Sequence, residues 1–520
     1  MARVKTLTDD RLIVAGVVVV GLAALLFRLG QGPMLDFDEA TYAEIAREIG
    51  VFHDFVHLHF DFAPWFNKAP LYQWLTYLVY QPLGVNELSA RLVSALAGAG
   101  TVGLTYAVAR TWLGRSAAAA AALMLLLSNL FVRAARFGTS DVLLTFWLWA
   151  ALYAYLRSRA NPCWWYAVGA CCGLAFMTKD IASLVGPIAI ALAALYEMRG
   201  ALLRRPEPWL GLLLAVAIAL PWHLAMYAWQ GQAFFTQFIG YMVVARSKAQ
   251  IEGHTGGIAY YAIWSGIGFY PWIYAAAAGF VQHVLVDLRQ RRTSVVLALF
   301  CLVILGLYTA VRSKLYWYID PIFPAYAIFA AGGAAWLVRR RGPLPVAAAA
   351  VIALVAIWVG PGSVRNVPPP VVVGFTVLLG VAAAAGVLLR GRVEPVLAAA
   401  ALAFVVASAA AVAPLYDLPQ QPGAALGTAA RLTPPVTMLA YVSSRRRYPD
   451  DDIAHSLTFY SHRPVRAVIG LERLKATLPC GQTMDTVLDR RDLGGLGTGF
   501  SWQERFAWFD LGLGTLTRNC

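Results

Sequence analysis

The sequence predicts an all-α, polytopic membrane protein that ends in a small α/β domain. The chain has 520 residues, of which 59% are hydrophobic and only 13% are charged. Apolar runs long enough to cross a bilayer follow one another from Leu12 onward, and after residue 432 they shorten while charged residues return. This pattern is typical of a membrane domain followed by a domain outside the bilayer.

The apolar runs predict about thirteen membrane spans, because a spanning helix needs roughly 20 mostly apolar residues. Only a helix satisfies its own backbone where no water can reach. The stretch 69–83 fits either a further span or an interfacial helix, and the first span is too long for a signal-peptide core, which predicts an uncleaved anchor. The predicted spans are 12–29, 88–110, 116–134, 138–156, 163–178, 180–197, 208–229, 258–282, 294–311, 316–337, 344–360, 370–389 and 395–414.

The formal net charge of +14 comes largely from arginines in alternate connections between the predicted spans. With the N-terminus in the cytoplasm, this alternation follows the positive-inside rule and places 30–87, 230–257 and the chain after residue 415 on the outer side. The basic surplus is therefore a topology signal and does not indicate a nucleic-acid partner. The arginines are Arg110, Arg115, Arg157, Arg159, Arg199, Arg204, Arg205, Arg289, Arg291, Arg292, Arg339, Arg340, Arg341, Arg390 and Arg392.

Two domains are predicted: a membrane domain at 1–432, with its site in the outer loops 30–87 and 230–257, and an extracytoplasmic α/β domain at 433–520. Cys480 and Cys520 lie in the second domain, where an oxidising compartment would permit a disulfide, and the sequence leaves their pairing open. Cysteines in predicted spans are expected to pack as small apolar residues. These are Cys163, Cys171, Cys172 and Cys301.

Several basic residues remain on the predicted outer side, where the positive-inside rule disfavours them. Each alone fits a side chain that snorkels to lipid phosphate. As a group they indicate an anionic ligand at the outer membrane face, and lipid-linked phosphates are the natural candidates. The set comprises Arg47, Lys68, Arg133, Arg136, Lys179, Arg246, Lys248, Arg312 and Lys314.

The stretch DFDEATYAEIAREIG at 36–50 follows the first span and carries a cluster of carboxylates. It predicts a helix capped by Asp36 or Asp38 and stopped by Gly50. The helix is expected to lie along the membrane surface, with one apolar and one polar face. Capping alone also explains acidic residues at a helix start. The expected apolar face holds Tyr42, Ile45, Ala46 and Ile49, and the polar face holds Glu44, Arg47 and Glu48.

Six segments, in order, resemble motifs of the polyprenyl-phosphate-dependent glycosyltransferases of the GT-C type, in particular the aminoarabinose transferases of lipid A and the protein-mannosyltransferase-like family. They are DFDEATYAEIARE at 36–48, NKAPLYQWLTYLVYQPLGVNELSARLVSAL at 67–96, RFGTSDVLLTFW at 136–147, LAFMTKDIASLVGP at 174–187, EGHTGGIAYYAIWSGIGFYPW at 252–272 and RSKLYWYIDPIFPAYAI at 312–328. LTFYSHRPV at 457–465 is also similar to a strand of the family's C-terminal domain.

The resemblance implies a GT-C fold and transfer of a sugar, with inversion, from a polyprenyl-phosphate donor to an acceptor hydroxyl or phosphate. The reaction would take place at the outer face of a bacterial inner membrane, among membrane lipids, and the acceptor could be a lipid, a glycan or a protein. The acceptor hydroxyl needs a base, and the leaving phosphate gains negative charge that cations and hydroxyls must stabilise.

Asp38 is the expected base, because it matches the family's loop aspartate, with Glu39 as a secondary carboxylate; helix capping is the alternative role for Asp38. Asp141 is the second catalytic candidate, and a salt bridge to Arg133 or Arg136 would explain it equally well. His254 and Tyr42 are expected to contact the acceptor or the sugar.

The resemblance places Lys68 on the donor phosphate. The full set expected to bind that phosphate is Lys68, Lys179, Arg246, Lys248, Lys314 and Tyr318. Lys314 and Tyr318 are four residues apart and are expected to share one helix face. Arg246 and Lys248 lie in a loop long enough to close over a bound donor, although ordinary solvated charges would look the same.

The chain departs from the family at Thr41, Asn67 and Ala69, where the aminoarabinose transferases have arginine, glutamate and proline. The acidic partner of a metal at His254 is therefore missing, so a divalent metal is left open and no other cofactor is expected. The departures also leave the sugar open.

Two other classes share some of these features. A flippase or transporter of a lipid-linked anion would also have outer basic residues and many spans, but transporters usually contain repeated halves with sites at the bilayer midplane. An O-antigen-ligase-like enzyme would also use a polyprenyl-linked donor, but it would have its large outer loop late in the chain.

Overall fold

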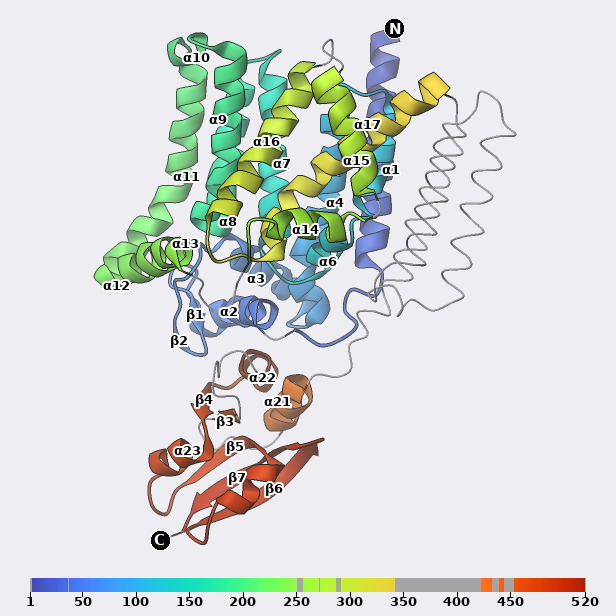
Figure 1. Ribbon diagram of the computed structural model, residues 1–520. Helices are drawn as coiled ribbons and strands as arrows, with labels where there is room; N and C mark the ends of the chain where they lie inside the picture. Colours follow the sequence, from blue (N-terminus) through green and yellow to red (C-terminus); the bar gives the residue numbers. More distant parts are fainter. Residues whose placement is uncertain are drawn as a thin grey trace. The chain divides into compact units, whose positions relative to one another are not determined.

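The computed structural model describes residues 2–35, 37–249, 256–270, 272–286, 291–341, 422–432, 439–443 and 453–519 (Figure 1). Within these ranges the chain forms two compact units. The helical unit comprises 1–29, 67–72 and 92–415, and the loop–sheet unit comprises 30–66, 73–91 and 416–520.

The helical unit consists of long helices joined by short helical turns. Its α-helices are α1 (Ala2–Leu26), most of α4 (Glu87–Ala109), α5 (Arg115–Leu125), α6 (Asn129–Arg136), α7 (Asp141–Ser158), α8 (Trp164–Lys179), α9 (Val185–Met198), α10 (Ala201–Arg204), α11 (Pro206–Gln230), α12 (Gln232–Phe235), α13 (Arg246–Lys248), α14 (Tyr260–Gly268), α15 (Ile273–Phe280), α16 (Arg291–Ala310) and α17 (Phe323–Arg341). Its described part also contains the 3-10 helices Asp180–Leu184 and Tyr316–Ile322 and the π-helices Thr236–Ala245 and Val281–Val286.

The described residues hold 4 helical stretches long and apolar enough to cross a membrane, or 5 if the bent pair α5 and α6 forms one span. The four are Glu87–Ala109, Trp164–Met198, Pro206–Gln230 and Thr293–Ala310. Three predicted spans, 344–360, 370–389 and 395–414, lie outside the described residues. The number thirteen therefore stays a prediction.

Several predicted spans are interrupted. The helix α3 (Leu71–Leu83) has 13 residues, too few for a span. The predicted span 258–282 is divided into α14, α15 and a π-helix, and 316–337 begins as a 3-10 helix. The chain bends by 64° between α5 and α6. Ser128 stabilises this bend, because its Oγ accepts a hydrogen bond from Phe131 N and donates one to Gly268 O at 2.9 Å.

Helices α8 and α11 approach each other closely through glycines. A Cβ atom built on Gly169 would lie 1.9 Å from the carbonyl oxygen of Gly211. Small residues at such positions let backbones of membrane helices pack directly. The glycine pair therefore sets the spacing of these two helices.

The loop–sheet unit contains the outer-loop elements α2 (Asp38–Phe52), β1 (His59–Phe60), β2 (Ala63–Pro64), most of α3 and the start of α4. Its C-terminal part forms α21 (Pro422–Leu432), β3 (Leu439–Ser443), α22 (Ala454–Ser461), β4 (Val465–Ile469), α23 (Leu471–Thr477), β5 (Thr483–Asp489), a 3-10 helix (Arg490–Gly495), β6 (Phe500–Trp508) and β7 (Leu511–Arg518). The segment 457–465 is mostly helix α22, so the strand expected there is wrong and begins only at Val465.

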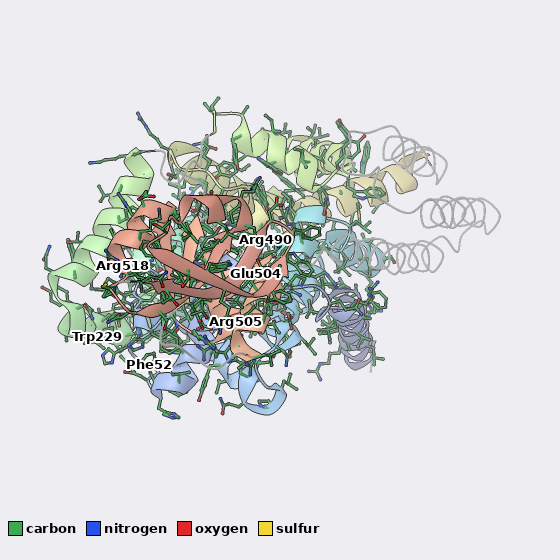
Figure 2. All side chains as sticks on the ribbon, turned by 90° about the horizontal axis from the view of Figure 1, so that it is seen from below. Phe52, Trp229, Arg490, Glu504, Arg505 and Arg518 are labelled. Carbon is green, nitrogen blue, oxygen red and sulfur yellow. The ribbon has the colours of Figure 1, made fainter. Side chains whose placement is uncertain are left out.

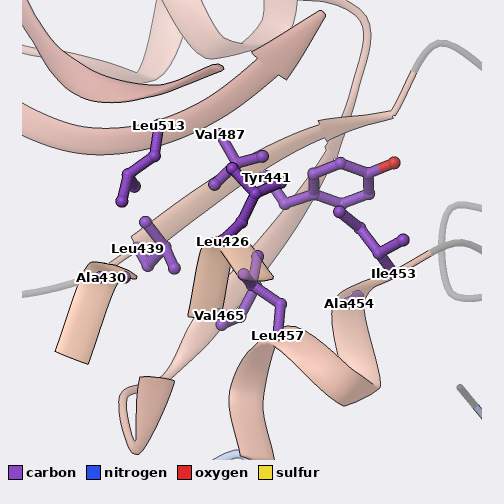
Figure 3. Packing of buried hydrophobic residues seen from close by; sticks show 10 residues of the cluster. All are labelled: Leu426, Ala430, Leu439, Tyr441, Ile453, Ala454, Leu457, Val465, Val487 and Leu513. Carbon is purple, nitrogen blue, oxygen red and sulfur yellow. The ribbon is translucent and has the colours of Figure 1, made fainter. Parts of the chain in front are cut away.

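The C-terminal sheet has the strand order β4-β3-β5-β7-β6. Strand β3 is parallel to β4 and β5, and β7 is antiparallel to β5 and β6. Helices α21 and α22 cover one apolar face, which Leu457, Val487 and Leu513 help to fill (Figure 3). Helix α23 supplies Leu474 to the core on the other face. Parallel strands with helices on both faces form an α/β domain, as predicted.

Charged side chains on and beside this sheet form ion pairs. Figure 2 shows Arg490, Glu504, Arg505 and Arg518, and Arg490 pairs with Glu504 at 3.0 Å. Asp485 on β5 is fully buried and pairs with Arg505 and with Arg463, the latter at 3.0 Å. Two guanidinium groups thus balance the buried carboxylate. Helix α21 packs on β6 and β7. The predicted domain boundary at residue 432 coincides with the last residue of this helix.

We expect Gly169→Ala to destabilise the protein, because the added methyl would force α8 away from α11. Overpacking of this kind costs about 1–3 kcal/mol, so the melting temperature of the detergent-purified protein should fall by several degrees. Gly306→Ala in α16 is the matched control, since a Cβ there has nothing within 4 Å. Equal melting temperatures for the two variants would contradict the close contact.

Candidate active site

A buried ion pair joins two helices of the helical unit. Asp141 is the first residue of α7 and Lys179 is the last residue of α8, and both side chains are buried. The ammonium of Lys179 donates to Asp141 Oδ1 and lies 5.1 Å from the centre of the Tyr318 ring. The structure therefore brings three of the predicted site residues together.

The partners expected for Asp141 were wrong. Arg136 donates instead to the carbonyl oxygens of Leu25 and Phe27 at the end of α1, at 2.9 and 2.8 Å. Arg133 lies over the rings of Phe137 and Tyr316, 5.2 and 5.5 Å from their centres. These two arginines satisfy a helix end and an aromatic pair, which leaves Lys179 to neutralise Asp141.

Asp320 is a second buried carboxylate beside this pair, and sequence reasoning missed it. Its side chain is 1% exposed, and neither oxygen has a hydrogen-bond partner among the described residues. The charges that act on it are those of Asp141, Lys179 and Arg133. A carboxylate inside the apolar run around 316–328 was the available signal, because ionisable groups at membrane depth usually have a function.

Lys68 lies in a short segment tied to the end of α8. The amide of Ala69 donates to Asp180 Oδ1 at 2.9 Å, and Gln237 donates to Asn67 Oδ1 at 2.9 Å. The charge of Lys68 acts on Asp180, which is partly exposed. The segment 67–69 thus connects α8 to the π-helix Thr236–Ala245, and Lys68 itself is half-buried.

An apolar cavity of about 650 Å³ opens between α8, α9, α11, α12 and the π-helix that follows α12. Aliphatic and aromatic side chains line it, including Cys172, Phe176, Leu212 and Phe234. His223 is the exception: its Nε2 is buried, has no hydrogen-bond partner in the described part of the chain and lies 3.8 Å from Asp180 Oδ1. The cavity is therefore apolar except at His223.

The two other basic segments predicted for phosphate lie side by side. The amide of Arg312 donates to Ser247 O at 3.3 Å, and Ser313 Oγ donates to Ala249 O at 2.8 Å. Lys248, between these contacts, is exposed. The predicted loop 230–257 is helical over most of its described part, and the side chain of Arg246 lies outside the described residues.

Lys314 and Tyr318 do not share a helix face, so that expectation was wrong. The 3-10 helix begins at Tyr316, after Leu315 in an extended conformation. The ammonium of Lys314 donates to Thr309 O at 2.8 Å and also to Val311 O, at the end of α16. Burial lowers the pKa of Lys314. This lysine therefore satisfies carbonyl groups that the end of α16 leaves without donors.

Asp38 begins helix α2 in the loop–sheet unit and is partly exposed. The N-cap position belongs to Phe37, whose side chain makes no capping hydrogen bond, and Asp36 lies outside the described residues. Helix α2 continues past Gly50 to Phe52, so the predicted stop was wrong; His53 ends it in the left-handed conformation. Tyr42 is buried, 6.4 Å from the Trp65 ring.

The predicted polar face of α2 is buried, because α22 and the hairpin β1–β2 pack on this helix. Glu39 accepts bonds from Arg91 at 2.8 and 3.2 Å and from Leu35 N at 2.8 Å. Arg47 pairs with Glu44. The amide of Phe62 in the hairpin donates to Glu48 Oε1 at 3.0 Å. The apolar face was predicted correctly.

Two carboxyl groups of this unit have raised pKa values. Burial, reinforced by the neighbouring Glu44, raises the pKa of Glu48 to about 9. Burial also raises the pKa of Asp61 to about 7, although the amide of Val465 donates to Asp61 Oδ1 at 2.6 Å and opposes the shift. Both groups therefore hold protons at a pH where ordinary carboxyls are ionised.

In the described part of the chain no group of three or more His, Cys, Asp or Glu side chains could hold a metal ion. His254 lies outside that part, so its role in binding metal, acceptor or sugar stays a prediction.

Comparison with known proteins shows which class this chain resembles. Residues 67–229 match the family described as dolichyl-phosphate-mannose-protein mannosyltransferase. The chain is 30% identical over 301 residues to undecaprenyl phosphate-alpha-4-amino-4-deoxy-L-arabinose arabinosyl transferase 2 of Pseudomonas fluorescens, a match covering 56% of this chain and 51% of that protein. It is 28% identical over 337 residues to the arabinosyl transferase of Pectobacterium atrosepticum, covering 62% and 60% of the two chains. The matches thus span little more than half of these relatives.

Solved structures extend the likeness to nearly the whole chain. The crystal structure of ArnT from Cupriavidus metallidurans bound to undecaprenyl phosphate matches with a TM-score of 0.79 and 23% identity, covering 96% of this chain and 97% of that one. The apo oligosaccharyltransferase of Archaeoglobus fulgidus matches with a TM-score of 0.54 and 12% identity, covering 93% and 70%. The chain therefore has a GT-C-type fold, and the resemblance predicted from its six motifs is confirmed.

We expect the melting temperature to fall as the pH rises from 5 to 9. Asp61 and Glu48 have folded-state pKa values of about 7 and 9, above their ordinary 3.8 and 4.5. The folded state therefore binds more protons, and its stability is lost as the pH rises through the folded pKa values. Asp61→Asn combined with Glu48→Gln removes both titrations. The melting temperature of this variant should therefore fall between pH 5 and 9 by a few degrees less than that of the wild type. Parallel pH profiles for the variant and the wild type would contradict the assignment.

Proposed function

We propose that this protein is a glycosyltransferase that moves a sugar from a polyprenyl-phosphate donor to an acceptor at the outer face of a bacterial inner membrane. The observation that carries the proposal is a GT-C-type fold in which a buried cluster of carboxylate, lysine and tyrosine side chains adjoins the ends of apolar helices. Inversion at the anomeric carbon is part of the proposal.

The helical unit is proposed to bind the donor. Lys68, Lys179 and Tyr318 supply cations and a hydroxyl for the phosphate, which gains charge as the sugar leaves. The exposed Lys248 and its neighbour Arg246 are assigned to the same anion. The apolar cavity beside His223 fits an isoprenoid chain, since its lining is otherwise apolar. The carbonyl contacts of Lys314 favour a structural role over phosphate binding.

The loop–sheet unit is proposed to activate the acceptor. Asp38 accepts the proton of the acceptor hydroxyl as that oxygen attacks the anomeric carbon and the bond from the sugar to the phosphate breaks. Glu39 accepts hydrogen bonds from Arg91 and from the amide of Leu35, which supports a structural role for it. Asp141, paired with Lys179, is proposed to set the position of that lysine.

The sidedness of the chain is also proposed. Cys480 is disulfide-bonded, whereas Cys163, Cys171, Cys172 and Cys301 are free. Cys172 and Cys301 are buried as expected, but Cys163 is exposed at the start of α8. Structural disulfides persist in oxidising compartments. The disulfide and the arginine-rich connections both support a periplasmic position for the C-terminal domain and for the loop 30–87, with about thirteen spans.

The relatives' names suggest an aminoarabinose carried on undecaprenyl phosphate as the first donor to test. Lipid A, another glycolipid, a polysaccharide or a protein could accept the sugar. Mass spectrometry of envelope glycans from cells with and without this protein would identify the sugar and the acceptor. Unchanged glycans, together with no sugar release from the purified protein, would reject the proposed function.

Asp38→Asn should leave the protein folded and able to bind undecaprenyl phosphate, but it should lower the transfer rate roughly 100-fold or more, because the amide cannot accept the proton. The same purified sample would be used for the melting temperature, product binding and sugar transfer. If Asp38 acts only at the helix start, the melting temperature will change and the rate will not.

Lys68→Ala should weaken binding of undecaprenyl phosphate roughly tenfold and should lower the transfer rate, because a charge-assisted contact is lost. Lys475→Ala is the control: Lys475 pairs with the exposed Glu472 in the C-terminal domain. Titration of the product by intrinsic fluorescence would measure both variants. Equal affinity in the two would show that Lys68 does not touch the phosphate.

A further inference from the structure

The backbone immediately before Asp38 is strained. Phe37 has φ 75° and ψ −132°, a combination that residues with a side chain rarely adopt. Such a conformation costs on the order of 1–3 kcal/mol and persists only where the surroundings impose it. In many proteins it occurs next to functional groups. The groups that hold Phe37 therefore decide where Asp38 points.

One side chain of the C-terminal domain contacts both ends of this turn. The ring of His455 in α22 lies 5.4 Å from the ring of Phe37 and is stacked on Phe60 at 5.2 Å. His455 Nδ1 also forms a hydrogen bond with Thr41 Oγ1 at 2.6 Å. Since the amide of Thr41 donates to Phe37 O at 2.9 Å, His455 brackets the turn that contains Asp38.

Other contacts fix α22 on the outer loop and so fix His455. The amide of Met34 donates to the hydroxyl of Tyr460 at 2.8 Å, and that hydroxyl donates to Glu87 at 2.8 Å. Phe459 packs with Met34, Ala40, Ala43, Ala46, Tyr80 and Ala90 in a buried apolar cluster. Helix α22 is therefore also held by contacts one turn after His455, and the position of the histidine does not depend on its own bonds alone.

We infer that His455 is a positioning residue for Asp38, through which the C-terminal domain holds the proposed base in place. This inference rests on the proposed function of Asp38. The short hydroxyl side chain of Thr41 faces the histidine of the C-terminal domain directly, with Thr41 Oγ1 2.6 Å from His455 Nδ1. A displacement of about 1 Å in a reacting group can cost roughly 100-fold in rate.

The test compares His455→Ala and His455→Phe in the full-length protein, with His57→Ala as control; His57 pairs with Asp54 in the same unit. Hydrogen exchange of the Thr41 amide reports the turn without reference to catalysis. We expect exchange to rise at least tenfold in His455→Ala and to rise less in His455→Phe, which keeps the stacked ring. Unchanged exchange in His455→Ala would overturn the inference whatever the protein catalyses.

Sugar transfer then tests the consequence for the rate. We expect His455→Ala to lower kcat roughly tenfold with little change in binding of undecaprenyl phosphate. In the Asp38→Asn background His455→Ala should add little, because a residue that acts through Asp38 has nothing left to position. Full additivity, or an unchanged kcat in His455→Ala, would overturn the positioning role. A wild-type protein that transfers no sugar, together with faster exchange of the Thr41 amide in His455→Ala, would reject the proposed function. The catalytic part of the inference would then be rejected with it.

Discussion

A lysine buried near the ends of apolar helices must be paired, and the pairing of Lys179 with Asp141 organises the helical unit. Removing one partner of such a pair leaves a buried charge and costs several kcal/mol, so the start of α7 and the end of α8 are held together. The end of α8 continues into Asp180, which accepts a hydrogen bond from the amide of Ala69 and lies near His223. One ion pair thus places the segment of Lys68, the mouth of the apolar cavity and Tyr318 relative to each other.

In the loop–sheet unit the first helix, α2, carries four carboxylates, and most of them are buried. Glu39, Glu44 and Glu48 are buried, and each has a partner from an arginine or a backbone amide. Asp38 differs because it is partly exposed at the start of the helix. The acidic cluster therefore divides into three buried groups that attach the loop to its neighbours and one group at the helix start that is partly exposed.

The class of fold and the apolar faces could be predicted from composition and periodicity, because burial in lipid and burial against a protein core both select apolar side chains. The α/β nature of the tail followed from its change in composition. The burial of Glu44 and Glu48 could not be predicted, because it depends on α22, which follows them by about four hundred residues in the chain. The same reason hid His455. The partner of Asp141 was missed because Lys179 becomes its neighbour only when α7 and α8 pack.

At the broken helices of this chain, two basic side chains bind carbonyl oxygens, a role distinct from both snorkelling to lipid and ligand binding. Lys314 and Arg136 donate to carbonyl groups that two helix ends leave exposed in an apolar setting. An anion could recruit Lys314 only by depriving Thr309 and Val311 of their donor. Its affinity for that lysine is reduced by the free energy of those lost bonds, so the same positive charge that stabilises the helix end discriminates against weakly bound anions.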